Sequence, residues 1–172
     1  MASRGARWVL RLAAVACACA APFHGQADET PQNWFGDPFV QVSASVHGCL
    51  EPLGPRMSKA DRLAQSHHRA ERGTTCFLHG ECEQPNAYRY DAAIADQLVR
   101  QLRLNHRVVT SSLWVTVQGR IVYLEGCAPD PARAGAEWER LARAVPQVTQ
   151  VVTSVYTGRG RPPYQTLRPY QP

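Results

Sequence analysis

Between Tyr90 and Thr157 the apolar positions follow a helical period, then a strand period, then a helical period again. The first helical stretch begins at Asp91, whose side chain can accept from the free N–H groups of a helix start, and runs to about Leu104. Its apolar stripe consists of Ile94, Leu98 and Leu102, with Ala95 and Val99 beside it. We therefore expect one face of this helix to pack on a core.

Alternating side chains follow at residues 113–126 and predict two strands joined by a turn at Gln118-Gly119-Arg120. The next helix has Asp130 as its N-cap and Pro131 at its first position, where φ is already set, and Pro146 stops it. Its apolar positions are Ala134, Trp138, Leu141 and Val145. This spacing predicts a second amphipathic helix.

A last strand is expected at residues 148–156, which completes the order αββαβ. The sequence thus predicts an α+β fold in which two helices cover one face of a three-stranded mixed sheet. Residues 28–89 carry little helix or strand signal except at about 59–72, where Ser58 starts a capping box and Gly73 can end the helix. We expect this part to be an irregular segment that disulfides staple onto the module.

The αββαβ module also carries the residues of a family resemblance. Val122-x-Leu124-x-Gly126 closes the hairpin, and Val148-x-x-Val151 opens the last strand. Together with the Asp91 helix start, these residues resemble a BON domain over about Tyr90 to Thr157. The resemblance implies a bacterial envelope module, periplasmic or lipid-anchored, that binds phospholipid or other envelope components.

Two positions depart from the pattern of that family. Arg120 stands where a glycine usually lies two residues before the strand valine, and Gly119 comes one place earlier. Gln147 stands before Val148, where the family usually has a glycine. Because Gly119 can still supply φ > 0, we expect an altered hairpin with a one-residue bulge or a longer loop.

Residues 1–27 have the composition of a signal peptide. A basic region precedes the apolar run Leu12 to Ala21, which is too short to span a bilayer. The basic residues are Arg4, Arg7 and Arg11. Cleavage is expected after Ala27, with Ala20 and lipoprotein processing at Cys17 as the alternatives. We expect a periplasmic protein with no transmembrane span after signal removal.

Four cysteines follow the signal peptide, and an even number in an exported chain predicts disulfides. They are Cys49, Cys76, Cys82 and Cys127. Of the three pairings, Cys76 with Cys82 is the most natural, because the five-residue loop between them contains a glycine. Cys49 with Cys127 would then clasp the N-terminal region to the end of the second strand.

The same cysteines lie near histidines, so a metal or redox role is the alternative. His67, His68, Cys76, His79 and Cys82 fall within sixteen residues and could offer zinc ligands. Five residues separate the two cysteines, however, and structural zinc motifs favour two to four. There is no C-x-x-C motif, and paired thiols leave no nucleophile. We expect no metal, no cofactor and no catalytic residue.

Basic and acidic residues nearly balance once the two ends of the chain are left out. Nineteen basic residues include three arginines before residue 28 and three after residue 157, so 13 remain against 14 acidic residues. This balance gives no reason to expect nucleic-acid binding. The Pro-rich tail, residues 158–172, is basic and is expected to be disordered, extended and solvated. It is either an inert extension or a segment that rests on an anionic surface.

The resemblance and the charge placement together predict a non-enzymatic protein that adsorbs to anionic membrane. The contacts would be Arg100, Arg103 and Arg107 on the first helix, helped by an exposed Trp114. The alternative without a binding role is that these arginines are only the polar face of that helix and that the N-terminal segment covers Trp114.

The alternative function is that of a protein-interaction subunit of an envelope complex. It would use the aromatic segment Trp34 to Gln41, which includes Phe35, or an open sheet edge. The aromatic residues of that segment would otherwise anchor it to a small core.

Overall fold

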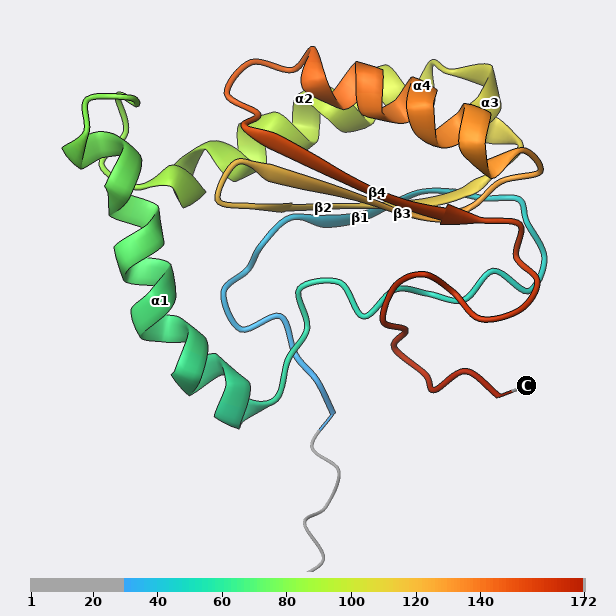
Figure 1. Cartoon of the computed structure of the whole chain (residues 1–172), viewed down its shortest axis with the longest axis horizontal. Helices are drawn as coiled ribbons and strands as arrows, with labels where there is room; N and C mark the ends of the chain where they lie inside the picture. Colours follow the sequence, from blue (N-terminus) through green and yellow to red (C-terminus); the bar gives the residue numbers. More distant parts are fainter. Residues whose placement is uncertain (1–29, 172) are drawn as a thin grey trace, which may run out of the picture.

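The computed structural model describes residues 30–171, so the predicted signal peptide and the alternative at Cys17 lie outside the described part of the chain (Figure 1). In chain order the elements are β1 (Phe39–Ala44), α1 (Lys59–Leu78), the 3₁₀ helix η1 (Ala87–Tyr90), α2 (Asp91–Arg103), α3 (His106–Val109), β2 (Ser112–Gln118), β3 (Ile121–Cys127), α4 (Pro131–Arg143) and β4 (Gln150–Tyr156). None of these helices is long and apolar enough to cross a bilayer. The class is α+β, as predicted.

The sheet is mixed and has the strand order β1-β2-β3-β4. β1 and β2 are antiparallel, as are β2 and β3, whereas β3 and β4 are parallel and are connected through α4. The prediction of three strands is wrong by one, because β1 comes from the segment expected to be irregular. Its residues pair with the free edge of β2, from Phe39 opposite Thr116 to Ala44 opposite Ser112. A partner strand, and not local pattern, therefore makes this segment a strand.

α2 and α4 lie on the same face of the sheet (Figure 1). Their apolar stripes meet the inward side chains of β2 and β3 in a core that includes Leu98, Leu102, Leu113, Leu124 and Trp138, all with 0 % exposure. Ile94, Ala95, Ala134 and Val145 extend this core. The apolar positions that the sequence pattern singled out therefore form the interior, apart from Leu141, which packs half-buried against it.

The β2–β3 hairpin has a two-residue turn and no bulge, so the expectation of an altered hairpin is wrong. Gln118 pairs directly with Ile121, and the two turn residues both have positive φ, 59° at Gly119 and 71° at Arg120. This is the geometry of the turn that matches the twist of a hairpin. The bulge lies instead in β1, between Gln41 and Ser43.

Asp91 fixes this turn from the start of α2. Its carboxylate accepts from the backbone N–H of Gly119 at 2.6 Å and of Arg120 at 2.7 Å. Burial raises the pKa of Asp91 to about 6, although these two donors favour its charged form. The prediction that Asp91 caps this helix is wrong, because the N-cap of α2 is Tyr90, without a side-chain hydrogen bond, and the Asp91 carboxylate clamps the hairpin instead.

The opposite face of the sheet is covered by the chain before α1 and by the C-terminal tail (Figure 1). Cys49 bonds to Cys127 at the end of β3, with the two Cα atoms 5.9 Å apart. Tail residues pair with the same loop, since Gln165 accepts from Leu53 N–H at 2.8 Å and Leu167 donates to Glu51 at 2.9 Å. This part of the tail, expected to be extended and solvated, instead folds back onto the protein.

α1 projects from the body of the protein (Figure 1). Ser58 caps it, as predicted, by accepting from Asp61 N–H at 3.1 Å. The helix continues past Gly73, where the sequence suggested an end. A Cβ at Gly73 would lie 2.6 Å from the Asn86 side chain, so this glycine serves a close contact and not a helix stop.

Candidate functional site

Arg100 and Arg103 lie on the exposed face of α2, opposite its buried stripe. Leu104, directly after the helix, is 89 % exposed. Positions three and four residues apart are neighbours on a helix, so Arg100 adjoins both Arg103 and Leu104. Neither arginine forms an ion pair with any carboxylate of residues 30–171. We call these three residues the α2 patch.

Arg107, the third predicted contact, does not belong to the α2 patch. Its Nε lies 2.6 Å from the Glu137 carboxylate of α4. A hydrogen bond from Asn105 and the Arg107 charge lower the pKa of Glu137. Arg107 therefore neutralises a carboxylate and ties α3 to α4, and its charge is less available to an external ligand.

Trp114 was expected to be exposed, and the structure contradicts this, because only 6 % of it is accessible. It lies between Gln41 of β1 and Glu125 of β3 on the sheet face that points away from the helices. The chain before α1 and the tail run along this face (Figure 1). Trp114 thus belongs to a second, smaller core and cannot join the α2 patch in one contact surface.

Trp34 and Phe35 are half-buried and contribute to the attachment of α1. The indole of Trp34 donates to Met57 O at 2.8 Å and lies 5.4 Å from the guanidinium of Arg62. Phe35 packs on one arginine of α1, Arg69, at 4.1 Å from the ring centre. Both aromatic side chains are thus engaged within the protein.

Arg69 is the central residue of that attachment. It lies 3.8 Å from the ring centre of Tyr88 and makes a two-fold ion pair with Asp37, at 2.7 and 2.9 Å. Gln118 of β2 also donates to Asp37, at 2.6 Å. Because the pair is almost inaccessible, with 13 % and 4 % side-chain exposure, removal of one partner would leave a buried charge.

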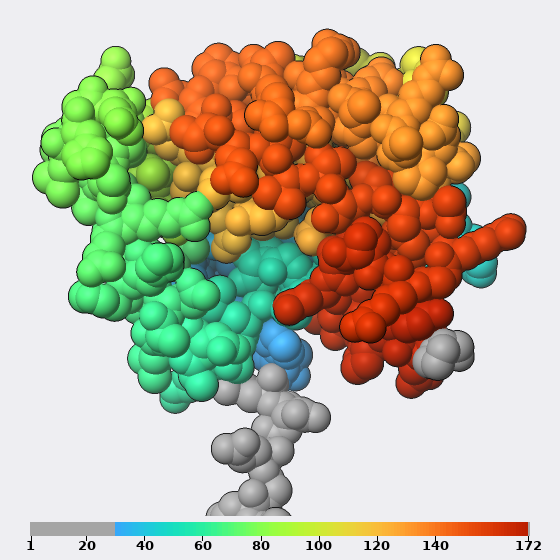
Figure 2. All heavy atoms as spheres, viewed as in Figure 1, coloured from blue at the N-terminus to red at the C-terminus, as the bar shows by residue number. Residues whose placement is uncertain are grey.

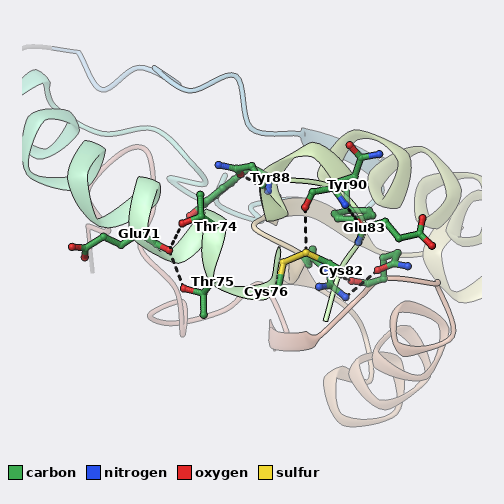
Figure 3. Close-up of a disulfide and its surroundings, with 12 residues drawn as sticks. Glu71, Thr74, Thr75, Cys76, Cys82, Glu83, Tyr88 and Tyr90 are labelled. Carbon is green, nitrogen blue, oxygen red and sulfur yellow. Dashed lines mark hydrogen bonds between the residues drawn. A yellow bond between two sulfur atoms is a disulfide. The ribbon is translucent and has the colours of Figure 1, made fainter. Parts of the chain in front are cut away.

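Cys76 and Cys82 form the other disulfide, at the far end of α1 (Figure 3). Directly before Cys76 in α1, Thr74 and Thr75 donate to the carbonyl of Glu71 at 3.2 and 2.9 Å (Figure 3). Both cysteine pairs therefore lie at bonding distance in the pairing that the sequence favoured.

The histidines that entered the zinc alternative do not converge on these cysteines. His67 lies 3.2 Å from Glu71 on the same helix face, and no group of three or more His, Cys, Asp or Glu side chains within residues 30–171 has a geometry that could hold a metal ion.

The sequence pattern found the two arginines of the α2 patch but missed Leu104. The sequence could have indicated this exposure, because Leu104 falls outside the stripe that Ile94, Leu98 and Leu102 form at a spacing of four residues. An apolar residue outside the stripe of an amphipathic helix is expected at the surface. Val109, the last residue of α3, is 61 % exposed and is a second exposed apolar residue near the same end of α2.

Neither protein-family models, nor curated proteins, nor solved structures give a match to this chain.

Proposed function

We propose that this protein is a non-enzymatic, BON-like module of the bacterial envelope that binds anionic phospholipid surfaces through the α2 patch. The observation that carries the proposal is the patch itself: Arg100 and Arg103 without carboxylate partners in residues 30–171, beside the exposed Leu104. Basic side chains next to an exposed apolar one are the composition of an interfacial contact.

The backbone supports the family resemblance at the two positions where the sequence departs from it. Arg120 and Gln147 are the non-glycine residues with positive φ among residues 30–171, both at 71°. Glycine is the residue that takes this conformation without cost, so a glycine in the family pattern at these positions fits the same backbone. Here the two side chains stabilise one another, since Arg120 donates to the Gln147 backbone oxygen at 2.8 Å and side-chain oxygen at 3.0 Å.

The glycine of the V-x-L-x-G motif has a steric reason in this fold. A Cβ at Gly126 would lie 2.0 Å from the carbonyl oxygen of Ser112 on the neighbouring strand. Real side chains do not tolerate such a contact, so β2 and β3 can pair closely only with glycine here. The two disulfides are those of a chain that folds in an oxidising compartment, in agreement with export to the periplasm.

The strength of the contact follows from its size. Each well-placed arginine contributes about 1 kcal/mol near an anionic surface, and full burial of a leucine contributes about 1.5–3 kcal/mol. The sum corresponds to weak, reversible adsorption that requires a high density of anionic lipid. The C-terminal tail runs over the sheet face opposite α2, so the two cannot meet the same flat membrane (Figure 1).

Vesicle flotation of the full chain tests this proposal. Anionic vesicles should carry the protein upward at low salt and release it as salt rises, because exposed charges are screened. Replacing both arginines, Arg100→Gln and Arg103→Gln, should lower the partition coefficient about 30-fold, which corresponds to about 2 kcal/mol. The control is Arg159→Gln with Arg161→Gln, the same change of charge on exposed tail residues. Equal losses in the two double variants would refute the α2 patch.

The alternative, a protein-interaction subunit, is favoured by one observation. β4 is the last strand of the sheet order, so its outer edge carries no strand within the described chain. A partner could add a strand there through backbone hydrogen bonds. Such binding would persist at high salt and would be insensitive to the arginine replacements, which separates it from lipid adsorption.

A further inference from the structure

The two edges of the sheet differ in how well they are protected against pairing with a further strand. The sheet ends at β1 on one side and at β4 on the other. β1 contains a bulge between Gln41 and Ser43, a distortion that keeps an edge from pairing. β4 pairs with β3 in an unbroken register from Gln150 to Tyr156, and its sequence, QVVTSVY, contains no charge and no proline. β4 therefore lacks the features that block a strand edge.

The outer edge of β4 is open in the described chain. No strand within residues 30–171 pairs with it, and Figure 1 draws β4 in front of the other strands with no segment over it. In Figure 2 its orange-red atoms reach the near surface between α4 and the C-terminal tail. Residues 152–156 are all half-buried, as expected of a strand with one side in the sheet and the other side accessible.

Alternate residues of β4 direct their backbone groups to this edge. In a parallel pair, the N–H and C=O of one residue both point to the neighbouring strand, and those of the next residue point away from it. Tyr156 accepts from the N–H of Ala128, directly after β3, at 2.9 Å, so the backbone of Tyr156 points to β3. Counting back from it, the backbone groups of Val155, Thr153 and Val151 point outward.

The side chains of these three residues point to the helical face. Val151 belongs to the main core, and a Cβ at Gly135 of α4 would lie 3.1 Å from Thr153 and 3.8 Å from Val155. An antiparallel partner strand bonds to the residues whose backbone groups point outward. A second β4 placed with Thr153 opposite Thr153 meets this condition along the whole strand, because Val151 then lies opposite Val155. Apolar side chains face apolar ones and no charges meet, so the strand is complementary to itself.

We propose that β4 pairs antiparallel with β4 of a second copy of this chain and joins the two sheets into one. Each copy contributes the same surface, as in most symmetric dimers. A strand of 7 residues spans about 24 Å, and a sheet with one helix layer is about 20 Å thick, so each copy buries on the order of 500 Å². The total of about 1,000 Å² is at the lower limit for a specific interface, and the dimer should therefore be reversible.

The flank of α4 beside this edge can accommodate the second copy. Glu137 pairs with Arg107 on the side of α3, so the opposite flank of α4 borders the outer edge of β4. That flank carries the exposed small residue Ala132 and Glu139, whose charge Arg143 neutralises at 2.7 Å. Two antiparallel α4 helices can thus approach one another without like charges in contact.

The symmetry of this pairing has a consequence that rests on the proposed function. The two-fold axis of an antiparallel strand pair stands perpendicular to the sheet, so the helices of both copies stay on the same side of it. Both α2 patches then face the same membrane surface, and their joint binding raises the overall affinity. Formation of the dimer itself requires no lipid.

Sedimentation velocity of the full chain without lipid, over a concentration series, tests the dimer. An interface of this size predicts a monomer–dimer equilibrium with a Kd of about 1–100 μM. Val152→Lys should weaken the dimer at least about tenfold, because it places two like charges diagonally across the strand pair on the face away from α4. Val109→Lys, the same change at a residue 61 % exposed on α3, should leave the Kd unchanged.

Amide hydrogen exchange of the unaltered protein tests the register independently of how the lysine variant folds. The amides of Val151, Thr153 and Val155 should gain protection as the protein concentration rises. Those of Val152 and Ser154 are already bonded to β3 and should change little. A dimer that protects other residues overturns the proposal. A chain that stays monomeric at high concentration also overturns it, and leaves the edge to a strand of another protein.

A variant of the α2 patch separates failure of the dimer from failure of the proposed function. The double variant Arg100→Gln with Arg103→Gln should lose vesicle binding and still dimerise without lipid. If the unaltered protein dimerises but does not float with vesicles, the dimer stands and the proposed function is wrong. If it floats but stays monomeric, the dimer is wrong and the α2 patch stands.

Discussion

The two faces of the sheet differ in both the side chains they present and what covers them. The face toward α2 and α4 presents Leu113, Val115, Val117, Val122 and Leu124, all fully buried against helices that lie next to these strands in sequence. The other face presents Trp114, Thr116, Gln118, Tyr123 and Glu125, and segments distant in sequence cover it. The first face is fully apolar, whereas the second combines one buried indole with polar side chains that line a cavity of about 250 Å³.

This difference shows that the two coverings are stabilised in different ways. The helices are held by continuous apolar burial. The layer over the second face is held by particular links: the Cys49–Cys127 disulfide, the Asp37–Arg69 ion pair, and backbone pairing of the tail with residues 51–53. The second layer should therefore depend on single bonds, and the first on summed packing.

The largest expected effect is loss of the long-range disulfide. Replacing Cys49 and Cys127 by serine opens a loop with a sequence separation of 78, and the chain-entropy model gives a loss of about 4.5 kcal/mol in the free energy of unfolding. Replacing Cys76 and Cys82, with a separation of 6, should cost about 2.4 kcal/mol. Urea unfolding of both double variants measures the difference. Equal losses would show that the covering layer does not depend on its disulfide.

The next effect separates the two faces by packing. Leu98→Ala removes a fully buried side chain from the helical face and should cost about 3 kcal/mol. Thr116→Val removes the unpartnered hydroxyl from the other face and keeps the shape of the side chain, so it should be neutral or stabilise by up to about 1 kcal/mol. Both are measured by urea unfolding. A loss above about 1 kcal/mol in Thr116→Val would show that the hydroxyl has a partner.

A third effect depends on pH and is confined to the second face. The pKa of Glu125 rises from 4.5 to about 7 on folding, so its contribution to stability is fully present below pH 4.5 and is lost as pH rises through 7. Glu125→Gln cannot ionise and should be more stable than the unaltered protein at pH 8 by about 2 kcal/mol, with little difference at pH 4. Urea unfolding at pH 4, 6 and 8 measures this.

The exposed Glu83→Gln is the matched control for that pH dependence. Its stability difference from the unaltered protein should stay flat between pH 4 and pH 8. If Glu125→Gln is equally flat, the carboxylate of Glu125 is solvated and the second face is not the polar interior described above.

The smallest effect concerns Gln147, in the turn between α4 and β4. Gln147→Gly removes a side chain from a backbone with φ of 71° and keeps the carbonyl that accepts from Arg120. Relief of the backbone strain at this positive φ contributes about 1–2 kcal/mol, which exceeds the entropic cost of glycine. We therefore expect the free energy of unfolding to rise by about 0.5 kcal/mol. Gln150→Gly, at an ordinary strand position, should instead destabilise. A loss in both variants would mean that the Gln147 side chain contributes more than its backbone costs.

The same contrast separates what the sequence can predict from what it cannot. The helical face follows from local pattern: the stripe of Ile94, Leu98 and Leu102 and the alternation of β2 and β3 each repeat within one element. The caps Ser58 and Asp130 are equally local, and both accept from the backbone as predicted. α2, β2, β3 and α4 were predicted to within a few residues at their ends, whereas α1 continues to Leu78 beyond the predicted end at about residue 72.

The second face depends on contacts that no local pattern contains. β1 becomes a strand because it pairs with β2, which lies 68 positions later at Ala44 opposite Ser112 and 77 positions later at Phe39 opposite Thr116. The tail folds back because Tyr164 donates to the carbonyl of Leu50 at 2.8 Å and packs edge-on against Tyr156. The burial of Trp114 and the isolation of Glu125 follow from this covering. For that reason the cavity could not be predicted from the sequence, whereas the arginines of the α2 patch could.

In the proposed adsorption, the exposed end of α2 faces the membrane and the opposite sheet face is turned away from it. Introducing an indole by Leu104→Trp places a fluorescent reporter in the α2 patch, and Leu63→Trp, at a residue 64 % exposed on α1, is its control. With anionic vesicles, we predict that the added fluorescence of Leu104→Trp shifts to the blue and is quenched by brominated lipid, and that Leu63→Trp changes little. Quenching of Leu63→Trp with none for Leu104→Trp would contradict the account.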